Sequence, residues 1–194
     1  MAAEGVTVVD DPTLPGHNGS FEYDDEGLLA KRHVLLRNGV LQEYLHCLET
    51  AAYFGTADNG AARTASYTDL PIPRMSNTFI EAGDSDLDSL LGEVKKGVLL
   101  CRARGGYVDS TRGHFSFEVE TGYEVADGKV GGQIRNCTLT GYTLETLARV
   151  LGLSREFELL DRGTCGKKGQ GVRTALGGPY VLVEYLTLGG SRLG

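Results

Sequence analysis

The stretch HFSFEVE, residues 114–120, alternates apolar and polar side chains, and this period of two predicts a β-strand with one buried face. A hairpin is predicted at HVLLRNGVLQEYL, residues 33–45, where Asn38-Gly39 separates two apolar runs. Asn-Gly is a strong hairpin signal because both central residues of a type I′ turn need positive φ. Together these two stretches favour an antiparallel sheet.

Other stretches extend this pattern in both directions along the chain. Residues 5–9, GVTVV, are a short β-branched run, and Asp127-Gly128 predicts a second tight turn. A final strand is predicted at residues 180–188, YVLVEYLTL, after Gly178-Pro179. The 28 glycines lie mostly between short apolar runs, which is typical of many tight turns.

Two helices are expected between the strands. Residues 85–96, SDLDSLLGEVKK, place leucines and a valine at helical spacing, with Ser85 as N-cap and Gly97 as stop. Residues 143–151, TLETLARVL, predict a second helix that ends at Gly152. The fold class is therefore α+β: mostly antiparallel β-sheet with about two helices.

Size and composition limit the classes of function. The 194 residues suit one domain, here residues 1–194. The net charge of −7 and the pI near 5.1 make direct nucleic-acid binding unexpected, because an acidic surface repels phosphates. No apolar stretch has the roughly 18–20 residues that a membrane helix needs, and the acidic N-terminus lacks the apolar core of a signal peptide. We therefore expect no membrane contact and a cytoplasmic location.

The four cysteines show no CxxC pair and no regular spacing, so we expect free thiols and not a disulfide framework. One of them, Cys165, lies in the glycine-rich segment GTCGKKGQG, residues 163–171. This segment fails the Walker pattern because Lys167 is followed by Lys168, not Ser or Thr. Neighbouring positive charge favours the thiolate, which ligates metals or attacks carbonyls. The alternatives are a small buried residue in a turn and a Cys–His nucleophile, for which no histidine partner is evident.

A second distinctive segment is LPIPRMSNTF, residues 70–79, whose two prolines hold an extended backbone. Arg74 and Asn77 have side chains suited to orienting a carboxylate or a peptide group of a substrate. A stiff surface connection, with Arg74 in a structural ion pair, is an equally good interpretation. The acidic run at residues 24–26 is more typical of a solvated turn than of a metal site.

Six segments, taken in order, carry a resemblance to a known family: DDEG (24–27), NGVLQEYL (38–45), SYTDLPIPRMSNTF (66–79), GGYVD (105–109), TCGKKGQ (164–170) and LTLGG (186–190). Together they resemble the TldD branch of the TldD/PmbA family, whose members are also called modulators of DNA gyrase. The PmbA (TldE) branch is less similar, because it lacks the PRMxNT segment and the CGKxGQ form. The resemblance begins near residue 6 and covers nearly the whole chain.

The resemblance implies a C-terminal domain of a zinc metallopeptidase whose members are about twice as long. The family's HExxxH motif, with two histidine ligands and the general-base glutamate, precedes the segment that matches VTVVDDPTLPG here, and the third ligand corresponds to Cys165. A thiolate and two imidazoles leave the open fourth position of a catalytic zinc. This chain contains no HExxxH, so its zinc site is incomplete, and alone it is expected to be inactive.

The resemblance also suggests substrate-binding residues and partners. The candidates for substrate binding are Arg74, Asn77 and Asp109. The implied substrates are unfolded or modified peptides, and the implied partner is a TldE-like or a second identical subunit. The alternative is a non-catalytic binding or assembly module of the same fold. Two departures bear on substrate choice: TGNGRRESY of the family is TADNGAARTASY here, and GGQVD is GGYVD.

Overall fold

The computed structural model describes residues 1–189; Gly190, the last residue of the LTLGG segment, lies outside them. The chain forms two compact units. We call the first the cysteine-loop unit, which contains Gly5–Glu81 and Phe157–Pro179. The second, the meander unit, contains Met1–Glu4, Ala82–Glu156 and the chain from Tyr180 on.

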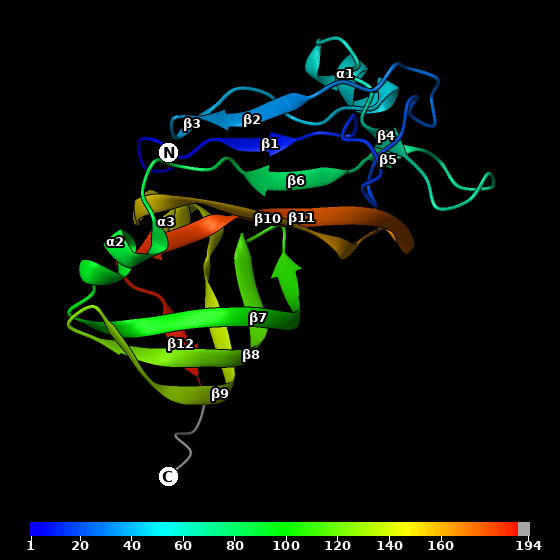
Figure 1. The fold of residues 1–194 in the computed structure, drawn as a ribbon. Helices are drawn as coiled ribbons and strands as arrows, with labels where there is room; N and C mark the ends of the chain where they lie inside the picture. The colour runs from blue at the N-terminus through cyan, green and yellow to red at the C-terminus, as the bar shows by residue number, and fades with distance from the viewer. Residues whose placement is uncertain (190–194) are drawn as a thin grey trace. The chain divides into compact units, whose positions relative to one another are not determined.

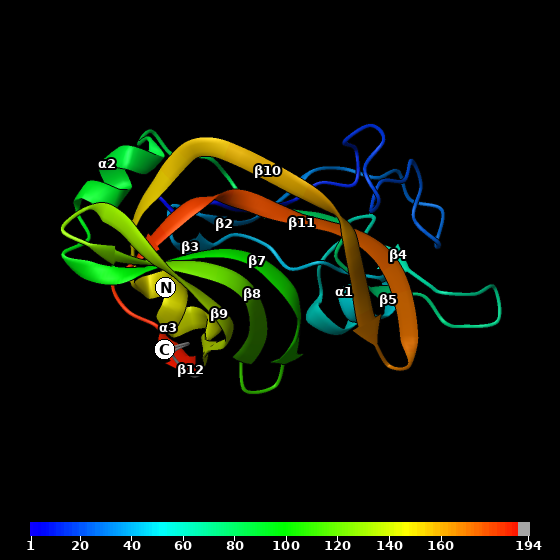
Figure 2. The ribbon, with the colours of Figure 1, turned by 60° about the horizontal axis from the view of Figure 1, so that its bottom comes forward.

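The cysteine-loop unit is built on a six-stranded sheet in the order β10-β11-β6-β1-β2-β3 (Figure 1). In it β1 runs antiparallel to both β2 and β6, whereas β11 runs parallel to β6. The long strands β10 and β11 lie side by side, as Figure 2 shows, and both have residues in each unit. The strands are β1 (Val8–Asp10), β2 (His33–Arg37), β3 (Val40–Leu41), β6 (Asn77–Ile80), β10 (Val150–Lys167) and β11 (Gln170–Val183).

The predicted hairpin at Asn38-Gly39 is confirmed, because it joins β2 to β3 with φ of 47° and 77° at the two turn residues. Two short strands pair with each other: β4 (Ala62–Arg63), and β5 (Ile72–Pro73) inside the 70–79 segment. The cysteine-loop unit also contains a helix that the sequence analysis missed, α1 (Leu48–Phe54).

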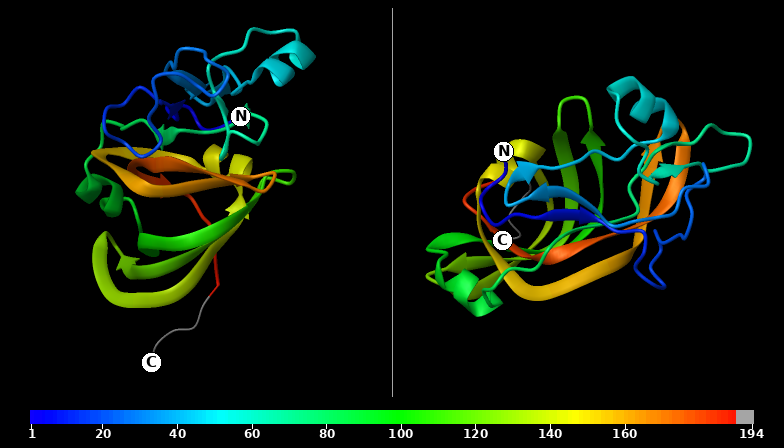
Figure 3. Two further views of the ribbon diagram at one scale, coloured as in Figure 1. Left: turned by 90° about the vertical axis from the view of Figure 1, so that its right-hand side faces the viewer. Right: turned by 90° about the horizontal axis from the view of Figure 1, so that it is seen from above.

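A four-stranded antiparallel sheet in the order β12-β9-β8-β7 forms the meander unit, and Figure 3 shows the curvature of its long strands. The HFSFEVE stretch opens β8, as predicted, and the turn at Asp127-Gly128 joins β8 to β9 with positive φ at both residues. The strands are β7 (Lys96–Asp109), β8 (His114–Ala126), β9 (Lys129–Tyr142) and β12 (Thr187–Gly189).

Both expected helices exist, but each is shorter than predicted. α2 spans Leu87–Gly92, and its N-cap is Asp86, whose carboxylate accepts a hydrogen bond from Ser89 N; Ser85 is not the cap. It stops early because the carbonyls of residues 94 and 95 accept hydrogen bonds from the β8–β9 turn. α3 spans Thr143–Ala148, and the predicted stop, Gly152, lies inside β10.

The prediction of a strand at 180–188 was wrong in its bounds. β11 continues through Gly178-Pro179 as far as Val183, and β12 begins only at Thr187. Even so, the architecture confirms an α+β fold that is mostly antiparallel sheet, with three helices among the described residues. Within the same part of the chain, no helix is long and apolar enough to cross a membrane.

A buried carboxylate links β1 to the start of β6. Asp10 is buried and accepts hydrogen bonds from the backbone N and the Oγ of Ser76, at 2.7 and 2.6 Å, and from Oγ1 of Thr78 at 2.6 Å. Hydrogen bonds to a charged acceptor are stronger than those between neutral groups. Asp10 therefore holds the end of the segment that carries Arg74 against the centre of the sheet.

Candidate metal-ligand loop

Cys165 lies two residues before the end of β10, which leads through a turn into β11. Lys168 and Gly169 form this turn with φ of 49° and 78°. The hairpin is tightly packed: a Cβ on Gly163 would lie 2.3 Å from Oγ1 of Thr174, so only glycine fits at that position. Cys165 is half-buried, and all four cysteines are free thiols. The loop thus presents one partly accessible thiol on a rigid hairpin.

The Arg74 guanidinium holds this hairpin in place. Its side chain is 1% exposed, and its Nε donates a hydrogen bond to Sγ of Cys165 at 3.5 Å. Its Nη2 donates to the carbonyl oxygen of Cys165 and, at 3.1 Å, to that of Gln170. Arg74 therefore contacts both strands of the hairpin and the sulfur itself.

A second guanidinium supports the same region. Arg63 on β4 donates through Nη1 to the carbonyls of Met75 and Arg173, both at 2.8 Å. Burial is the main cause that lowers the pKa of Arg63, and the negative charge of Asp10 opposes it. Arginine stays charged in proteins, so Arg63 acts as a fixed cation between β11 and the segment that precedes β6.

The turn at the tip of the hairpin is fastened to the proline segment from both sides. Gln170 accepts a hydrogen bond from Ala65 N at 3.1 Å and donates one to the carbonyl of Leu70 at 3.0 Å. Lys167 Nζ donates to the carbonyl of Pro73 at 3.2 Å. Lys167 and Gln170 thus fix the position of the loop relative to residues 65–73.

The surroundings of Cys165 fit one ligand of a metal, but not a complete set. A hydrogen bond from a guanidinium fixes the position of Sγ, and hydrogen-bond partners of this kind orient the ligands of metal sites. Nη1 of Arg74 is buried without a hydrogen-bond partner among the described residues. Within residues 1–189, Cys165 belongs to no group of three close metal-ligating side chains, and no hydrogen bond joins it to a histidine.

Asn77, a predicted substrate-binding residue, lies in the same unit as Cys165 at the start of β6 and is fully buried. Its Nδ2 donates to the carbonyl of Asp11 at 2.7 Å and to Oγ of Ser20 at 2.9 Å, while its Oδ1 accepts from Gly19 N at 2.9 Å. All the polar groups of this amide thus have partners within the fold. Its contact with substrate stays a prediction.

Asp109, the third predicted substrate-binding residue, is the last residue of β7 and belongs to the meander unit, not to the unit that carries Cys165. Its Oδ1 accepts hydrogen bonds from Thr111 N at 3.0 Å and Arg112 N at 3.1 Å. This carboxylate stabilises the turn into β8, and its role toward substrate also stays a prediction.

The acidic run at residues 24–26 contributes to a cluster of three carboxylates. Ligand atoms of Asp24, Glu26 and Asp58 lie within 4.8 Å of one another. Asp24 is buried and accepts from three backbone N–H groups, of Glu26, Leu28 and Ala62, so its charge stabilises a turn. Burial is the main cause that raises the pKa of Glu26, and the charge of Asp58 adds to it.

Comparison with known proteins gives consistent matches over almost the whole chain. A family model, the PmbA/TldA metallopeptidase C-terminal domain, matches residues 1–190. A "Metalloprotease" of Methanothermobacter thermautotrophicus is 42% identical over 191 residues, which are 98% of this chain and 41% of that protein. A "Metalloprotease TldD homolog" of Haemophilus influenzae is 37% identical over 95% of the chain and 39% of its own length. A "Zinc metalloprotease TldD homolog" of Saccharolobus solfataricus is 34% identical over 87% and 38%, respectively.

Solved structures share the fold. A protein of Thermotoga maritima described as a modulator of a DNA gyrase superposes with a TM-score of 0.78 and 26% identity, over 97% of this chain and 40% of that one. TldE of Thermococcus kodakarensis gives the same TM-score and coverage at 22% identity. The chain thus spans about two fifths of the length of the relatives that it matches.

The carboxylate cluster predicts a dependence of stability on pH. Because the pKa of Glu26 is raised in the folded state, its protonated form stabilises the fold at pH values below the ordinary pKa of 4.5. This stabilisation is lost as the pH rises through the folded-state pKa. Glu26→Gln should therefore raise the melting temperature at pH 7 by on the order of 1 °C, a small effect because the group is partly solvated, and by less at pH 4. Thermal unfolding at both pH values is the measurement, with exposed Glu22→Gln as the control. A lower melting temperature for Glu26→Gln at pH 7 would contradict the assignment.

Proposed function

Because the chain belongs to the TldD/PmbA metallopeptidase family, we propose that it is the C-terminal domain of a TldD-like zinc metallopeptidase and that Cys165 is one of the zinc ligands. The observation that supports this role is the hydrogen bond from buried Arg74 to Sγ of Cys165, made on a hairpin that is fastened at its tip. The other ligands are the two histidines of an HExxxH motif, which the resemblance places in a preceding part of the protein.

In this proposal the chain provides a preformed ligand and part of the peptide-binding surface. When bound, zinc activates water for attack on a peptide carbonyl. Arg74 and Gln170 keep the Cys165 loop rigid, so that little ordering is needed when the metal binds. Exposed Tyr67 and Leu70 belong to the 66–79 segment, beside which an extended peptide adds as a strand and is held by its backbone.

The substrates in this proposal are unfolded or modified peptides, and Arg74, Asn77 and Asp109 remain candidates for contact with them. The partner is a TldE-like or a second identical subunit, and the compartment is the cytoplasm. The isolated position of Cys165 also favours a second candidate function. Since Cys165 belongs to no group of three close metal-ligating side chains among the described residues, the domain also suits a non-catalytic assembly module.

The experiment that separates these functions is the metal content of cysteine variants. In the complete protein, Cys165→Ala should lose most of its zinc and its chelator-sensitive peptidase activity together, because a site of three protein ligands would retain two. Cys47→Ala and Cys137→Ala, at buried positions, should keep zinc and cost only stability. Mass spectrometry of the purified variants measures the metal. Full zinc occupancy in Cys165→Ala would place the third ligand elsewhere.

A second prediction concerns Arg74 as a positioning residue. Arg74→Lys keeps one positive charge but cannot reach Sγ and the two carbonyls together, so zinc affinity should fall by about tenfold or more. The thiolate-to-metal absorption of the cobalt-substituted protein should shift as well, which a general loss of stability would not cause. Arg32→Lys, at an exposed arginine that pairs with Glu81 in the same unit, is the matched control. Unchanged affinity and spectrum in Arg74→Lys would remove Arg74 from the metal site.

A further inference from the structure

Helix α1 buries little of its apolar surface. Ala51 is its one buried residue, whereas Leu48, Tyr53 and Phe54 are 56%, 83% and 64% exposed. A helix of seven residues is not stable by itself and depends on packing against other groups. The large apolar side chains of α1 are therefore open to a further contact, which residues 1–189 do not supply.

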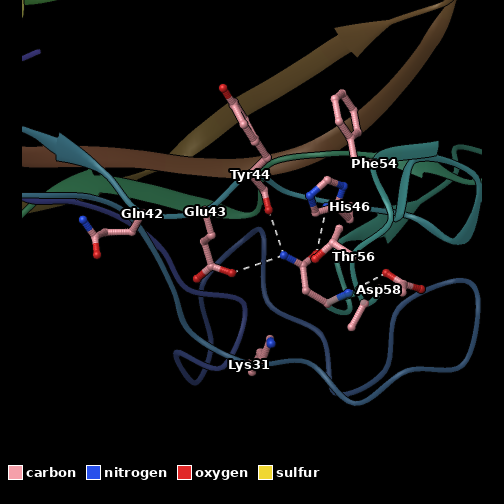
Figure 4. A pocket seen from close by; sticks show the side chains of 10 residues that line it. Lys31, Gln42, Glu43, Tyr44, His46, Phe54, Thr56 and Asp58 are labelled. Carbon is pink, nitrogen blue, oxygen red and sulfur yellow. Dashed lines mark hydrogen bonds between the residues drawn. The ribbon is translucent and has the colours of Figure 1, made fainter. Parts of the chain in front are cut away.

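The exposed rings of this helix belong to a continuous row. The Tyr53 ring meets the Phe54 ring edge-on with centroids 5.0 Å apart, and the Phe54 ring lies 6.5 Å from that of Tyr44 with planes inclined by 20°. Figure 4 shows the rings of Tyr44 and Phe54 pointing to the same side. Buried His46 supports both, with its ring centroid 6.4 and 5.9 Å from theirs. We call Tyr44, Phe54 and Tyr53 the aromatic row.

The size of the aromatic row favours a peptide segment over a folded partner. Exposed fractions of 61%, 64% and 83% leave about 300–500 Å² of side-chain surface open, since an aromatic side chain has roughly 150–250 Å² to bury. An exposed apolar patch of this size is often functional. Each partner in a stable protein–protein interface buries about 800 Å², so the row by itself is too small to hold a second subunit.

The helix that carries two of these rings also carries negative charge. Glu49 is exposed and precedes Tyr53 by four residues, so the two side chains are neighbours on the surface of α1. Oε2 of Glu26 accepts a hydrogen bond from Leu48 N at 2.8 Å, which places a second carboxylate at the start of the helix. Neither carboxylate forms an ion pair with a cation in the described part of the chain.

The pocket beside the aromatic row has the same sign of charge. Tyr44 and Phe54 line an open pocket of about 390 Å³ together with Glu43 and Asp58, and Lys31 is the one lysine or arginine among the residues that line it. Figure 4 shows Lys31 at the end away from the rings. A second copy of this chain, with the same carboxylates and a net charge of −7, would be repelled.

We propose that the aromatic row docks an unfolded peptide segment in which apolar side chains alternate with lysine or arginine. The apolar side chains cover the rings, and the cations lie against the carboxylates of Glu49 and Glu26. Lysine and arginine suit such a border because their aliphatic stems cover apolar surface while their charged ends stay in water. Acidic segments are repelled. This contact requires no metal and goes beyond the proposed zinc site.

The first arm of the test compares three peptides of equal length by isothermal titration calorimetry with the complete protein and a chelator. The first peptide alternates lysine with leucine and phenylalanine, the second has glutamate in place of lysine, and the third has serine in place of the apolar residues. The first should bind at least about tenfold more tightly than either of the others, because it alone offers both kinds of contact. Equal affinity for the lysine and glutamate peptides, or no binding of the first at millimolar concentration, would overturn the proposal. Because the chelator removes zinc, a failed zinc assignment leaves this result unchanged.

The second arm places the binding on the aromatic row. Tyr53→Ser removes an exposed ring and should weaken binding of the first peptide by about fivefold, whereas Tyr53→Phe keeps the ring and should bind as the parent does. Glu49→Gln removes only a charge and should weaken it by about twofold. Tyr107→Ser, at an exposed tyrosine of the meander unit, is the matched control and should bind as the parent does. Parent affinity in Tyr53→Ser or in Glu49→Gln would overturn the proposal.

Sedimentation velocity tests the other occupant, a second copy of the chain. The parent and Tyr53→Ser should sediment alike, because the aromatic row does not join copies. Dissociation of an oligomer by Tyr53→Ser would assign the row to self-association and overturn the proposal.

Discussion

The arrangement around Cys165 depends on one buried guanidinium. Arg74 is removed from water, and burying a charge is costly unless hydrogen bonds compensate. Its partners are the carbonyls of Cys165 and Gln170 and the sulfur of Cys165, so the compensation comes from the loop that presents the thiol. Arg74 cannot be satisfied unless the hairpin closes over it, and the hairpin tip is held by the same proline segment. The position of the sulfur is therefore linked to folding of the whole cysteine-loop unit.

Most of the fold prediction rested on turn-forming residue pairs and on the alternation of apolar and polar side chains in the strands. Asn38-Gly39 and Asp127-Gly128 specify turns through positive φ, which depends on the two residues alone. The helix lengths were overestimated because competing sheet hydrogen bonds lie far away in sequence. Helix α1, Leu48–Phe54, escaped prediction because it is seven residues long, has Cys47 at its N-cap and shows only one buried residue. Short helices of this kind depend on tertiary packing more than on propensity.

The candidate site was only partly predictable, for a related reason. Cys165 was recognised from a contiguous segment, GTCGKKGQG, that carries its own turn. The partners of Arg74 lie 91 and 96 residues away, so sequence reasoning could single out Arg74 but not its contacts. The contact between the Tyr44 and Phe54 rings was not predicted, because Phe54 lies on α1.

The most direct test of the account is zinc K-edge X-ray absorption of the complete protein. Cysteine and histidine ligands differ in both distance and scattering strength, with Zn–S near ~2.3 Å and Zn–N near ~2.0–2.1 Å. The account predicts one sulfur neighbour, which disappears in the Cys165→Ala variant. A first shell of nitrogen and oxygen alone in the unaltered protein would contradict a zinc role for Cys165.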